Sequence, residues 1–263
     1  MNAPERIALH DVQSRPDSRK LRIDAVGVKG LRYPVAIQAG ARVVPTIAAF
    51  SMTVGLAAVD KGTHMSRFVE LLEAQTEALS MPRFKGIVFD MLDRLDAPSG
   101  AIEMRFPYFV KKSAPVSGAQ SLLDYEVCWQ GTVSDDGEYS FWMHVMVPAT
   151  SLCPCSKEIS AYGAHNQRSC ITITAELLDE MAIEELISIA ERNASCEVYG
   201  LLKRPDEKYV TERAYDNPKF AEDLVRDVAL SLNREPRVGA YVVEAENFES
   251  IHNHSAFARI THA

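Results

Sequence analysis

The sequence lacks any apolar run long enough to cross a membrane, and its first residues lack the apolar core of an export signal. A membrane-spanning helix needs about 18 consecutive apolar residues, and an export signal carries a shorter apolar stretch behind a basic start. The chain begins instead with the polar stretch MNAPERIALHDVQSRPDSRK. We therefore expect a cytoplasmic protein with no membrane partner, in which residues 1–25 form a disordered tail.

An excess of basic residues is also missing. The 28 lysines and arginines are outnumbered by 36 aspartates and glutamates, which gives a formal net charge of -8 at pH 7 with neutral histidines. Proteins that bind a nucleic acid backbone need a basic face that displaces counterions. The charge balance therefore argues against a nucleic acid partner, although it is compatible with a local basic pocket for a phosphorylated small molecule.

Disulfide bonds and the common nucleotide-binding motifs are not expected either. The five cysteines are an odd number in a chain without an export signal, so their thiols should be reduced. Cys128, Cys170 and Cys196 lie among strand-like or helix-end residues, where we expect a buried structural role. The sequence contains no Gly-rich phosphate loop, dinucleotide fingerprint or nucleophile elbow. The chemistry must therefore come from other residues.

Patterns of apolar residues predict the secondary structure of the first half. β-prone apolar runs predict strands over residues 48–56 and 102–110. Two stripes at helical spacing lie between these strands, and we interpret MPRFKG at residues 81–86 as the break between two helices. The alternating segment LLDYEVCWQG then predicts a half-buried antiparallel strand, which the turn SDDGEY connects to its hairpin partner SFWMHVMVP.

The second half repeats this order of elements. The sequence predicts a strand over SCITITAEL, a helix over EELISIAERN, a helix that opens at Asn217-Pro218, and a strand over GAYVVEAEN. We therefore interpret the chain as an α+β protein with antiparallel sheets and paired helices on one side. The two tandem modules are predicted to span residues 26–134 and 135–263, and the second carries most of the candidate site residues.

The segment SLCPCSKEISAYGAHNQRS gathers the strongest candidates for chemistry. Cys153 and Cys155 flank a proline, so their side chains point in different directions, and one sulfur can face a site while the other serves a different role. A lone Cys-x-Cys is not the pair of knuckles found in structural zinc sites. It favours an incomplete ligand set that leaves positions open for water or substrate. His165 is the candidate for a second ligand.

Further candidates lie toward the C-terminus. His252 and His254 in IHNHS can point toward one pocket from an extended segment, and paired histidines suit metal ligation or proton transfer. A polar chain end is the alternative interpretation. Glu207, Glu222 and Glu249 lie near the other candidates. Glu222 follows a predicted helix start, where a carboxylate can face a cleft.

The motifs LCPCSKEIS, YGAHNQRS, KGTHMSRF and ESIHNHSAFA together resemble GTP cyclohydrolase IB, a bacterial type that is distinct from the zinc-dependent type IA. The resemblance extends from about residue 46 to residue 258. It implies a tunnelling fold, in which the sheets of neighbouring subunits join into barrels. It also implies a homotetramer with active sites at subunit interfaces, so that a monomer would be inactive.

The resemblance implies a reaction as well. GTP and water would give 7,8-dihydroneopterin triphosphate and formate, which is the first step of tetrahydrofolate biosynthesis. Water must attack C8 of the purine, the imidazole ring must open and the ribose must rearrange, so protons move at every stage. The family is metal-dependent, and we expect a divalent metal ion (zinc, manganese or iron) as cofactor.

Carried over residue by residue, the resemblance places Cys153, His165 and Glu207 near the metal ion. This mixed set of thiolate, imidazole and carboxylate is softer than an all-oxygen magnesium site and harder than a multi-thiolate zinc site, which is compatible with several divalent ions. Glu222 resembles the carboxylate that anchors guanine by accepting hydrogen bonds from its N1–H and 2-amino group.

The resemblance also assigns catalytic roles to four residues, which are Cys153, Cys155, Glu249 and His252. Lys157 and Arg168 are candidates for binding the triphosphate, with a solvated surface role as the alternative for each. The division of labour between the two cysteines stays open at this point. So do the roles of His64, for which local hydrogen bonding at a helix entry is expected, and of His254.

Two other functions fit the same residues. A related tunnelling-fold nitrile reductase would attack its substrate with one cysteine, take hydride from NADPH and need no metal ion. A non-catalytic purine-binding oligomer would use the cysteines and histidines to hold a structural metal ion, so that metal removal would dissociate or melt the assembly. Release of formate from GTP without NADPH would exclude the reductase, and a tetramer that stays folded but inactive after metal removal would argue against the structural-metal oligomer.

Overall fold

The computed structural model describes residues 11, 13 and 15–263. The tail predicted at residues 1–25 lies partly outside the described residues, and its last three residues belong to the first strand, β1 (Ile23–Ala39). None of the helices in the described part of the chain is long and apolar enough to span a membrane.

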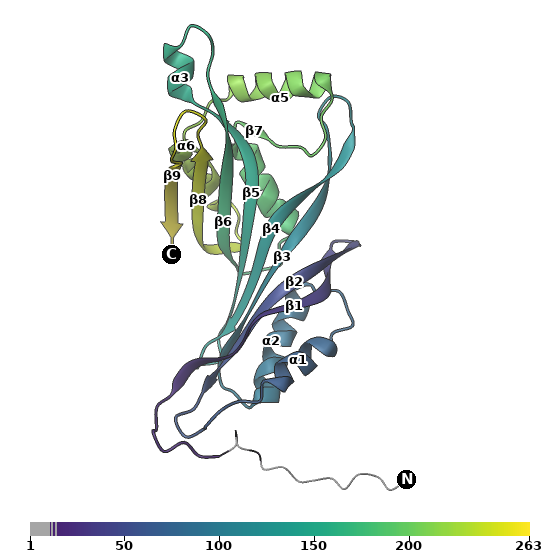
Figure 1. Cartoon of the computed structure of the whole chain (residues 1–263), viewed down its shortest axis with the longest axis vertical. Coiled ribbons are helices and arrows are strands. Elements are labelled where there is room, and N and C mark those ends of the chain that lie inside the picture. The colour runs from purple at the N-terminus through teal and green to yellow at the C-terminus, as the bar shows by residue number, and fades with distance from the viewer. Residues whose placement is uncertain (1–10, 12, 14) are drawn as a thin grey trace.

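One antiparallel sheet runs through the whole molecule (Figure 1). Its strands follow one another in chain order, so each new strand lies beside its predecessor in the path. The path consists of β1, β2 (Arg42–Leu56), β3 (Gly100–Ser113), β4 (Gln120–Val133), β5 (Tyr139–Leu152), β6 (Asn166–Leu177), β8 (Val238–Phe248) and β9 (Ala256–His262). The two-residue strand β7 (Cys196–Glu197) pairs with β5 outside this path.

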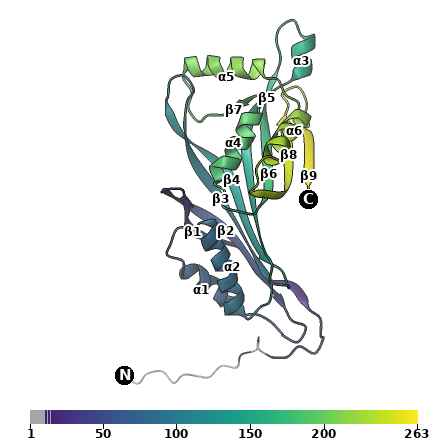
Figure 2. The ribbon, with the colours of Figure 1, turned by 180° about the vertical axis from the view of Figure 1, so that it is seen from behind.

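All helices except α3, which lies between β5 and β6, follow the strand pairs of each half. They are α1 (Ser66–Glu73), α2 (Met81–Leu95), α3 (Pro154–Ile159), α4 (Ile183–Asn193), α5 (Arg204–Asp216) and α6 (Ala221–Leu232). Helix α2 contacts β3 and β4, α4 contacts β5 and β6, and α6 contacts β8 and β9. Seen from behind, α4 and α6 lie in front of the strands of the second half (Figure 2). The sheet therefore has a helix-covered face in both halves, as the α+β prediction requires.

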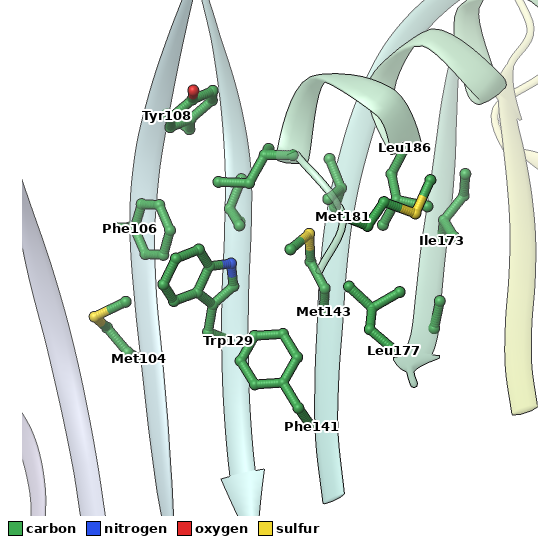
Figure 3. Close-up of a cluster of buried hydrophobic side chains, with 14 of the residues drawn as sticks. Met104, Phe106, Tyr108, Trp129, Phe141, Met143, Ile173, Leu177, Met181 and Leu186 are labelled. Carbon is green, nitrogen blue, oxygen red and sulfur yellow. The ribbon is translucent and has the colours of Figure 1, made fainter. Parts of the chain in front are cut away.

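The core is continuous across the two halves (Figure 3). The Trp129 ring meets Phe106 and Phe141 edge to face, with ring centroids 5.7 Å apart in both pairs. Beyond Phe141, the side chains of Met143 and Leu186 carry the apolar cluster into the second half. Because the cluster crosses from one half to the other, the two modules share one buried interior.

The structure confirms the predicted strands and corrects two helix boundaries. MPRFKG was predicted as a break, but it begins α2, because Ser80 caps this helix by accepting from the Arg83 backbone N–H at 3.2 Å. Pro82 fits the first turn, where its missing N–H costs nothing. The actual break is the segment 74–80.

The second correction concerns the helix predicted to open at Asn217-Pro218. Asn217 instead follows the last residue of α5, and α6 starts at Ala221 after Phe220. The Asn217 side chain donates to the carbonyl oxygen of Ala194 at 2.9 Å. Asn217 therefore holds the segment after α5 to the end of α4 and does not begin a helix. The sequence patterns also missed β1, β9, α3 and α5, all of which are short or mixed in polarity or lie near the chain ends.

Candidate active site

The two strongest candidates lie side by side just beyond the end of a hairpin. Strand β5 ends at Leu152 and β6 begins at Asn166, and these two residues form the last pair of the hairpin. The Cys153 backbone N–H then donates to the His165 carbonyl oxygen at 3.2 Å. The sheet therefore continues one step past its formal end and holds the thiol and the imidazole on adjacent strands.

The two cysteines differ in exposure, as the proline between them predicts. Cys153 precedes α3, and its sulfur accepts a hydrogen bond from the Ser156 backbone N–H at 3.4 Å. Pro154 occupies the first turn of this short helix. Cys153 is half-buried, whereas Cys155 is exposed. The backbone therefore holds one sulfur against the hairpin end and presents the other to solvent.

The turn between β8 and β9 lies at the same end of the sheet as α3 (Figure 1). Phe248 pairs with Arg168 of β6, so Glu249 follows at the edge of the hairpin that carries His165. The carboxylate oxygen Oε2 of Glu249 lies 3.4 Å from Nε2 of His252. The rings of His252 and His254 stack with centroids 5.0 Å apart. The two histidines do come together, although they do so in a turn rather than on an extended segment.

Helix α6 also begins beside the hairpin. The Lys219 backbone N–H donates to the Leu152 carbonyl oxygen at 3.1 Å, which fixes the entry to α6 next to Cys153. Glu222 lies in the first turn of this helix and is exposed. The structure therefore brings Glu222 to the same end of the sheet as Cys153.

Glu207 is the one predicted metal ligand that lies elsewhere. It lies in the first turn of α5, whereas the last turn of α5 contacts α3 through the Lys157 ammonium, 4.3 Å from the Tyr215 ring centre. About nine residues separate Glu207 from Asp216, or roughly 14 Å at 1.5 Å of rise per residue. Among the residues that the structure describes, no three His, Cys, Asp or Glu side chains are grouped closely enough to hold a metal ion.

The comparisons with known proteins bear on this arrangement. A family model described as type I GTP cyclohydrolase folE2 matches residues 9–258. The chain belongs to this family. A GTP cyclohydrolase FolE2 from Azoarcus sp. (strain BH72) is 58% identical over 261 residues, which cover 99% of this chain and 97% of that protein. A second one, from Janthinobacterium sp. (strain Marseille), is 59% identical over 98% of this chain and 96% of its own length.

Solved structures resemble this member of the GTP cyclohydrolase family in fold alone. The uricase from Arthrobacter globiformis has a TM-score of 0.51 and 7% identity, and the match covers 90% of this chain and 92% of that one. A urate oxidase from Bacillus sp. TB-90 has a TM-score of 0.50 and 9% identity over 91% and 99% of the two chains. These are tunnelling-fold proteins, so the predicted α+β tunnelling fold is confirmed.

The residues at the hairpin end fit the metal ion that the GTP cyclohydrolase family implies. The Nδ1 atom of His165 is buried and has no hydrogen-bond partner within the described chain. A buried imidazole nitrogen without a partner is costly unless it meets a ligand. A thiol on the neighbouring strand adds the second type of donor that divalent transition metals accept. Cys153 and His165 would therefore hold such an ion, with Glu207 as the predicted third ligand.

The remaining cysteines and the two candidate basic residues differ in burial and contacts. Cys128 and Cys196 are buried, and burial raises the pKa of both thiols to about 11, which suits the structural role predicted for them. Cys170 is only half-buried. Arg168 is exposed on β6. Lys157 donates to the Tyr215 carbonyl oxygen, so its ammonium already has a partner.

His64 makes a hydrogen bond at the entry to a helix, but its partner is distant in the sequence and not local as expected. Its Nε2 lies 3.0 Å from Oδ2 of Asp11, shortly before α1 begins. The role of this pair in a GTP cyclohydrolase stays open.

The sequence patterns missed Asp206, which lies next to Glu207 in α5. Asp206 is fully buried and accepts hydrogen bonds from the Val116 and Ser117 backbone N–H groups at 2.8 Å and from the Ser117 hydroxyl at 2.6 Å. It also accepts from the Lys203 backbone N–H at 2.8 Å. Burial by itself raises the pKa of Asp206, but these hydrogen bonds outweigh burial and hold the pKa below its ordinary value. An aspartate three residues after the N-cap Lys203 was the available signal.

Proposed function

We propose that the protein is a GTP cyclohydrolase I that acts in the cytoplasm and converts GTP and water to 7,8-dihydroneopterin triphosphate and formate, the first step of tetrahydrofolate biosynthesis. The observation that carries the proposal is the match to the GTP cyclohydrolase family over nearly the whole chain, at 58–59% identity to the two relatives above. The gathering of Cys153, His165, Glu222 and Glu249 at one end of the sheet supports it, because each would have a role in this reaction.

Glu222 would bind and orient the guanine. Its carboxylate is exposed at the start of α6 and can accept from both the N1–H and the 2-amino group of the base. This contact would place C8 of the purine toward the hairpin end. The exposure of the carboxylate in the single chain matches a binding group that meets its partner only when GTP arrives.

Cys153 and His165 would hold a divalent metal ion, whose chemistry when bound is to lower the pKa of a coordinated water toward neutrality. Which ion serves, whether zinc, manganese or iron, is not decided by the donor set, because thiolate, imidazole and carboxylate together accept several. The exposed Cys155 would act near the substrate rather than in the ligand set.

Glu249 and His252 would transfer protons. The Glu249 carboxylate lies 3.4 Å from Nε2 of His252 and would favour a proton on that nitrogen, which would leave Nδ1 to accept one from the attacking water. The protonated imidazole can then return a proton to the purine nitrogen that leaves when the ring opens. Both residues lie in one short turn, so their mutual geometry is set locally.

We further propose that the enzyme is a homotetramer with active sites at subunit interfaces. The distance of Glu207 from Cys153 along α5 supports this, because Glu207 would then reach the metal ion from a neighbouring subunit. The open edges of the sheet at β1 and β9 offer hydrogen-bonding groups for such an assembly.

The test is turnover of GTP by metal-stripped protein, with pterin product and formate measured after zinc, manganese, iron or magnesium is added back separately. We expect formate release to return with at least one ion in the wild type and in Cys170→Ala, a control outside the site. The Cys153→Ala variant should stay inactive with every ion. Absence of turnover from folded, tetrameric wild-type protein would overturn the proposal, and NADPH oxidation without formate would point to the reductase instead.

A further inference from the structure

The helix-covered face of the sheet changes from apolar to polar residues toward the candidate site. Along β5, β6 and β8, the inward-facing positions pass from apolar residues to small polar ones before they reach the site. The polar residues are Ser151, Ser169 and Asn247, and all three are buried. One step deeper on the same face lie the apolar residues Ala149, Ile171 and Ala245. Since side chains on a strand alternate between faces, each polar residue lies directly above an apolar one.

The three polar side chains form a chain of hydrogen bonds across the strands. The Ser169 hydroxyl oxygen lies 2.6 Å from the Ser151 hydroxyl oxygen and 2.7 Å from Oδ1 of Asn247. The Asn247 oxygen can only accept, so the Ser169 hydroxyl donates to it. The single proton of Ser169 is then used, and Ser151 must donate to Ser169. The chain thus has one direction, from β5 through β6 to β8.

Each end of this chain lies two residues from a candidate site residue. Ser151 precedes Cys153 on β5, and Asn247 precedes Glu249 at the end of β8. Ser169 lies on the central strand β6, which begins just after His165. The positions two apart share a face, so Ser151 lies one step beneath Cys153 and Asn247 one step beneath Glu249, whereas the buried Gln167 lies between Ser169 and His165. The β5–β6 pairing continues above this layer through Leu152 and Asn166 to the backbone bond from Cys153 to His165.

Stability alone does not account for three polar groups at this depth. Buried hydroxyl and amide groups cost free energy unless they are paired, and replacing them by apolar groups of similar shape is often neutral. The layer one step deeper is apolar, which shows that this sheet packs well without polar groups. Hydrogen bonds, unlike apolar contacts, fix distance and direction.

We propose that Ser151, Ser169 and Asn247 are positioning residues that set the spacing of Cys153, His165 and Glu249 across three strands. This inference rests on the proposed function only in naming what the site residues do. The hydrogen-bonded layer would keep the strand ends in register, so that Cys153 and His165 stay on adjacent strands and Glu249 stays at the same end of the sheet. Groups that orient metal ligands from behind typically change metal affinity or activity by roughly 10- to 100-fold when removed.

The test compares Ser169→Ala, which breaks the chain at its centre, with Ser169→Thr, which keeps the hydroxyl. Thr174→Val is the matched control, because it removes a β6 hydroxyl that lies 2.9 Å from Nδ1 of His144. Cobalt chloride is titrated into the metal-stripped full-length protein while the absorption bands of thiolate-bound cobalt are followed. We expect Ser169→Ala to bind cobalt roughly 10-fold more weakly and to shift these bands, with Ser169→Thr and Thr174→Val like the wild type.

Kinetics supply the second measurement. In Ser169→Ala we expect kcat for GTP to fall by roughly 10-fold or more while KM stays within about twofold, because the guanine anchor on α6 is untouched. Unchanged cobalt affinity, unchanged bands and unchanged kcat in a folded Ser169→Ala protein would overturn the positioning role. If Ser169→Ala does not fold, Ser151→Ala removes only the first hydroxyl of the chain and is judged by the same criteria.

The cobalt titration does not depend on turnover, so the two proposals fail separately. A wild-type protein that binds cobalt through thiolate but does not convert GTP would refute the proposed function and leave the positioning role intact. A wild-type enzyme that converts GTP, with Ser169→Ala identical to it in both measurements, would refute only the positioning role.

Discussion

The two halves of the chain share one plan but connect their helices differently. In the first half, residues 74–80 join α1 directly to α2. In the second half, residues 194–220 lie between α4 and α6 and add β7 and α5 to the plan. This longer connection lies at the same end of the molecule as α3 and the β8–β9 turn (Figure 1). The strands and helices common to both halves therefore serve as a scaffold. The candidate site residues lie at strand ends of the second half, at the start of α6 and in the added connection.

The largest difference in function between the two halves is expected from the first turns of α2 and α6. At the second position of the helix, α2 has Pro82 and α6 has Glu222. We predict that Glu222→Gln lowers kcat/KM for GTP by roughly 100-fold or more, because the amide presents one donor where the guanine needs two acceptors. Steady-state assays of pterin formation measure the effect. The control is Asp90→Asn, which changes an exposed acid on α2, and equal kinetics for both variants would remove Glu222 from the site.

The added connection can be tested by mixing subunits. Cys153→Ala and Glu207→Ala should each be inactive alone. If Glu207 reaches the metal ion from a neighbouring subunit, tetramers reassembled from an equal mixture should recover about a quarter of the wild-type activity, since that share of interfaces combines two intact contributions. The activity of the mixture after denaturation and refolding measures this. Recovery no greater than the sum of the single variants would place all three ligands in one subunit.

Asp206 ties the added connection to the first half, because its carboxylate binds the turn between β3 and β4. We predict that Asp206→Asn lowers Tm by roughly 5 °C or more, because the amide replaces one acceptor oxygen with a donor that faces other donors. Thermal unfolding followed by circular dichroism measures the change. The exposed Asp216→Asn, at the other end of α5, should leave Tm unchanged.

The same residue gives a pH dependence with a defined sign. The folded-state pKa of Asp206 is held below its ordinary value, so the unfolded chain binds this proton more readily than the folded one. Its contribution is fully present above the ordinary carboxyl pKa of about 3.9 and is lost as the pH falls below it. The Tm difference between wild type and Asp206→Asn should therefore be constant from pH 5 to pH 8 and should shrink in more acidic buffer. A difference that grows on acidification would contradict this assignment.

The smallest effect is expected on the outer surface of the same helix. Lys208 and Glu212 form an exposed pair one turn apart on α5. Glu212→Ala should change the free energy of unfolding by no more than about 0.5 kcal/mol, because exposed pairs gain little beyond the cost of ordering two long side chains. Urea unfolding at moderate salt measures this value. A loss as large as that of Asp206→Asn would mean that α5 is held by its surface and not by its buried start.

The sequence predicts much of the fold because the strands and packed helices bury one face. The alternation in LLDYEVCWQG and the stripes in α2 and α6 follow directly from that burial. Helix α5 was missed because only Asp206 and Ala214 are buried, so no apolar stripe marks it. The break at MPRFKG was misplaced because proline and glycine often mark breaks between helices, although the first turn of a helix also accepts proline. The module boundary between residues 134 and 135 stays a prediction.

The candidate site was predicted in part by residue type and in part by resemblance. The proximity of Cys153 and His165 follows from a hairpin whose length places one opposite the other. The separation of Glu207 from them could not be predicted, because it depends on the direction in which α5 crosses the molecule. Asp206 escaped notice together with the rest of helix α5. The buried serines escaped notice because a polar residue in an alternating strand looks the same whether it faces solvent or a hydrogen-bonded interior.

The order of the strands has a consequence for how the chain can fold during its synthesis on the ribosome. Every strand in the path from β1 to β9 is added to the free edge left by strands already made, and none has to be inserted between two earlier partners. The β1–β4 sheet and its two helices can therefore pack while the second half is still being synthesised. The thiols, histidines and acids of the candidate site all lie from Cys153 onward, so they emerge after the β1–β4 sheet on which the second half can assemble.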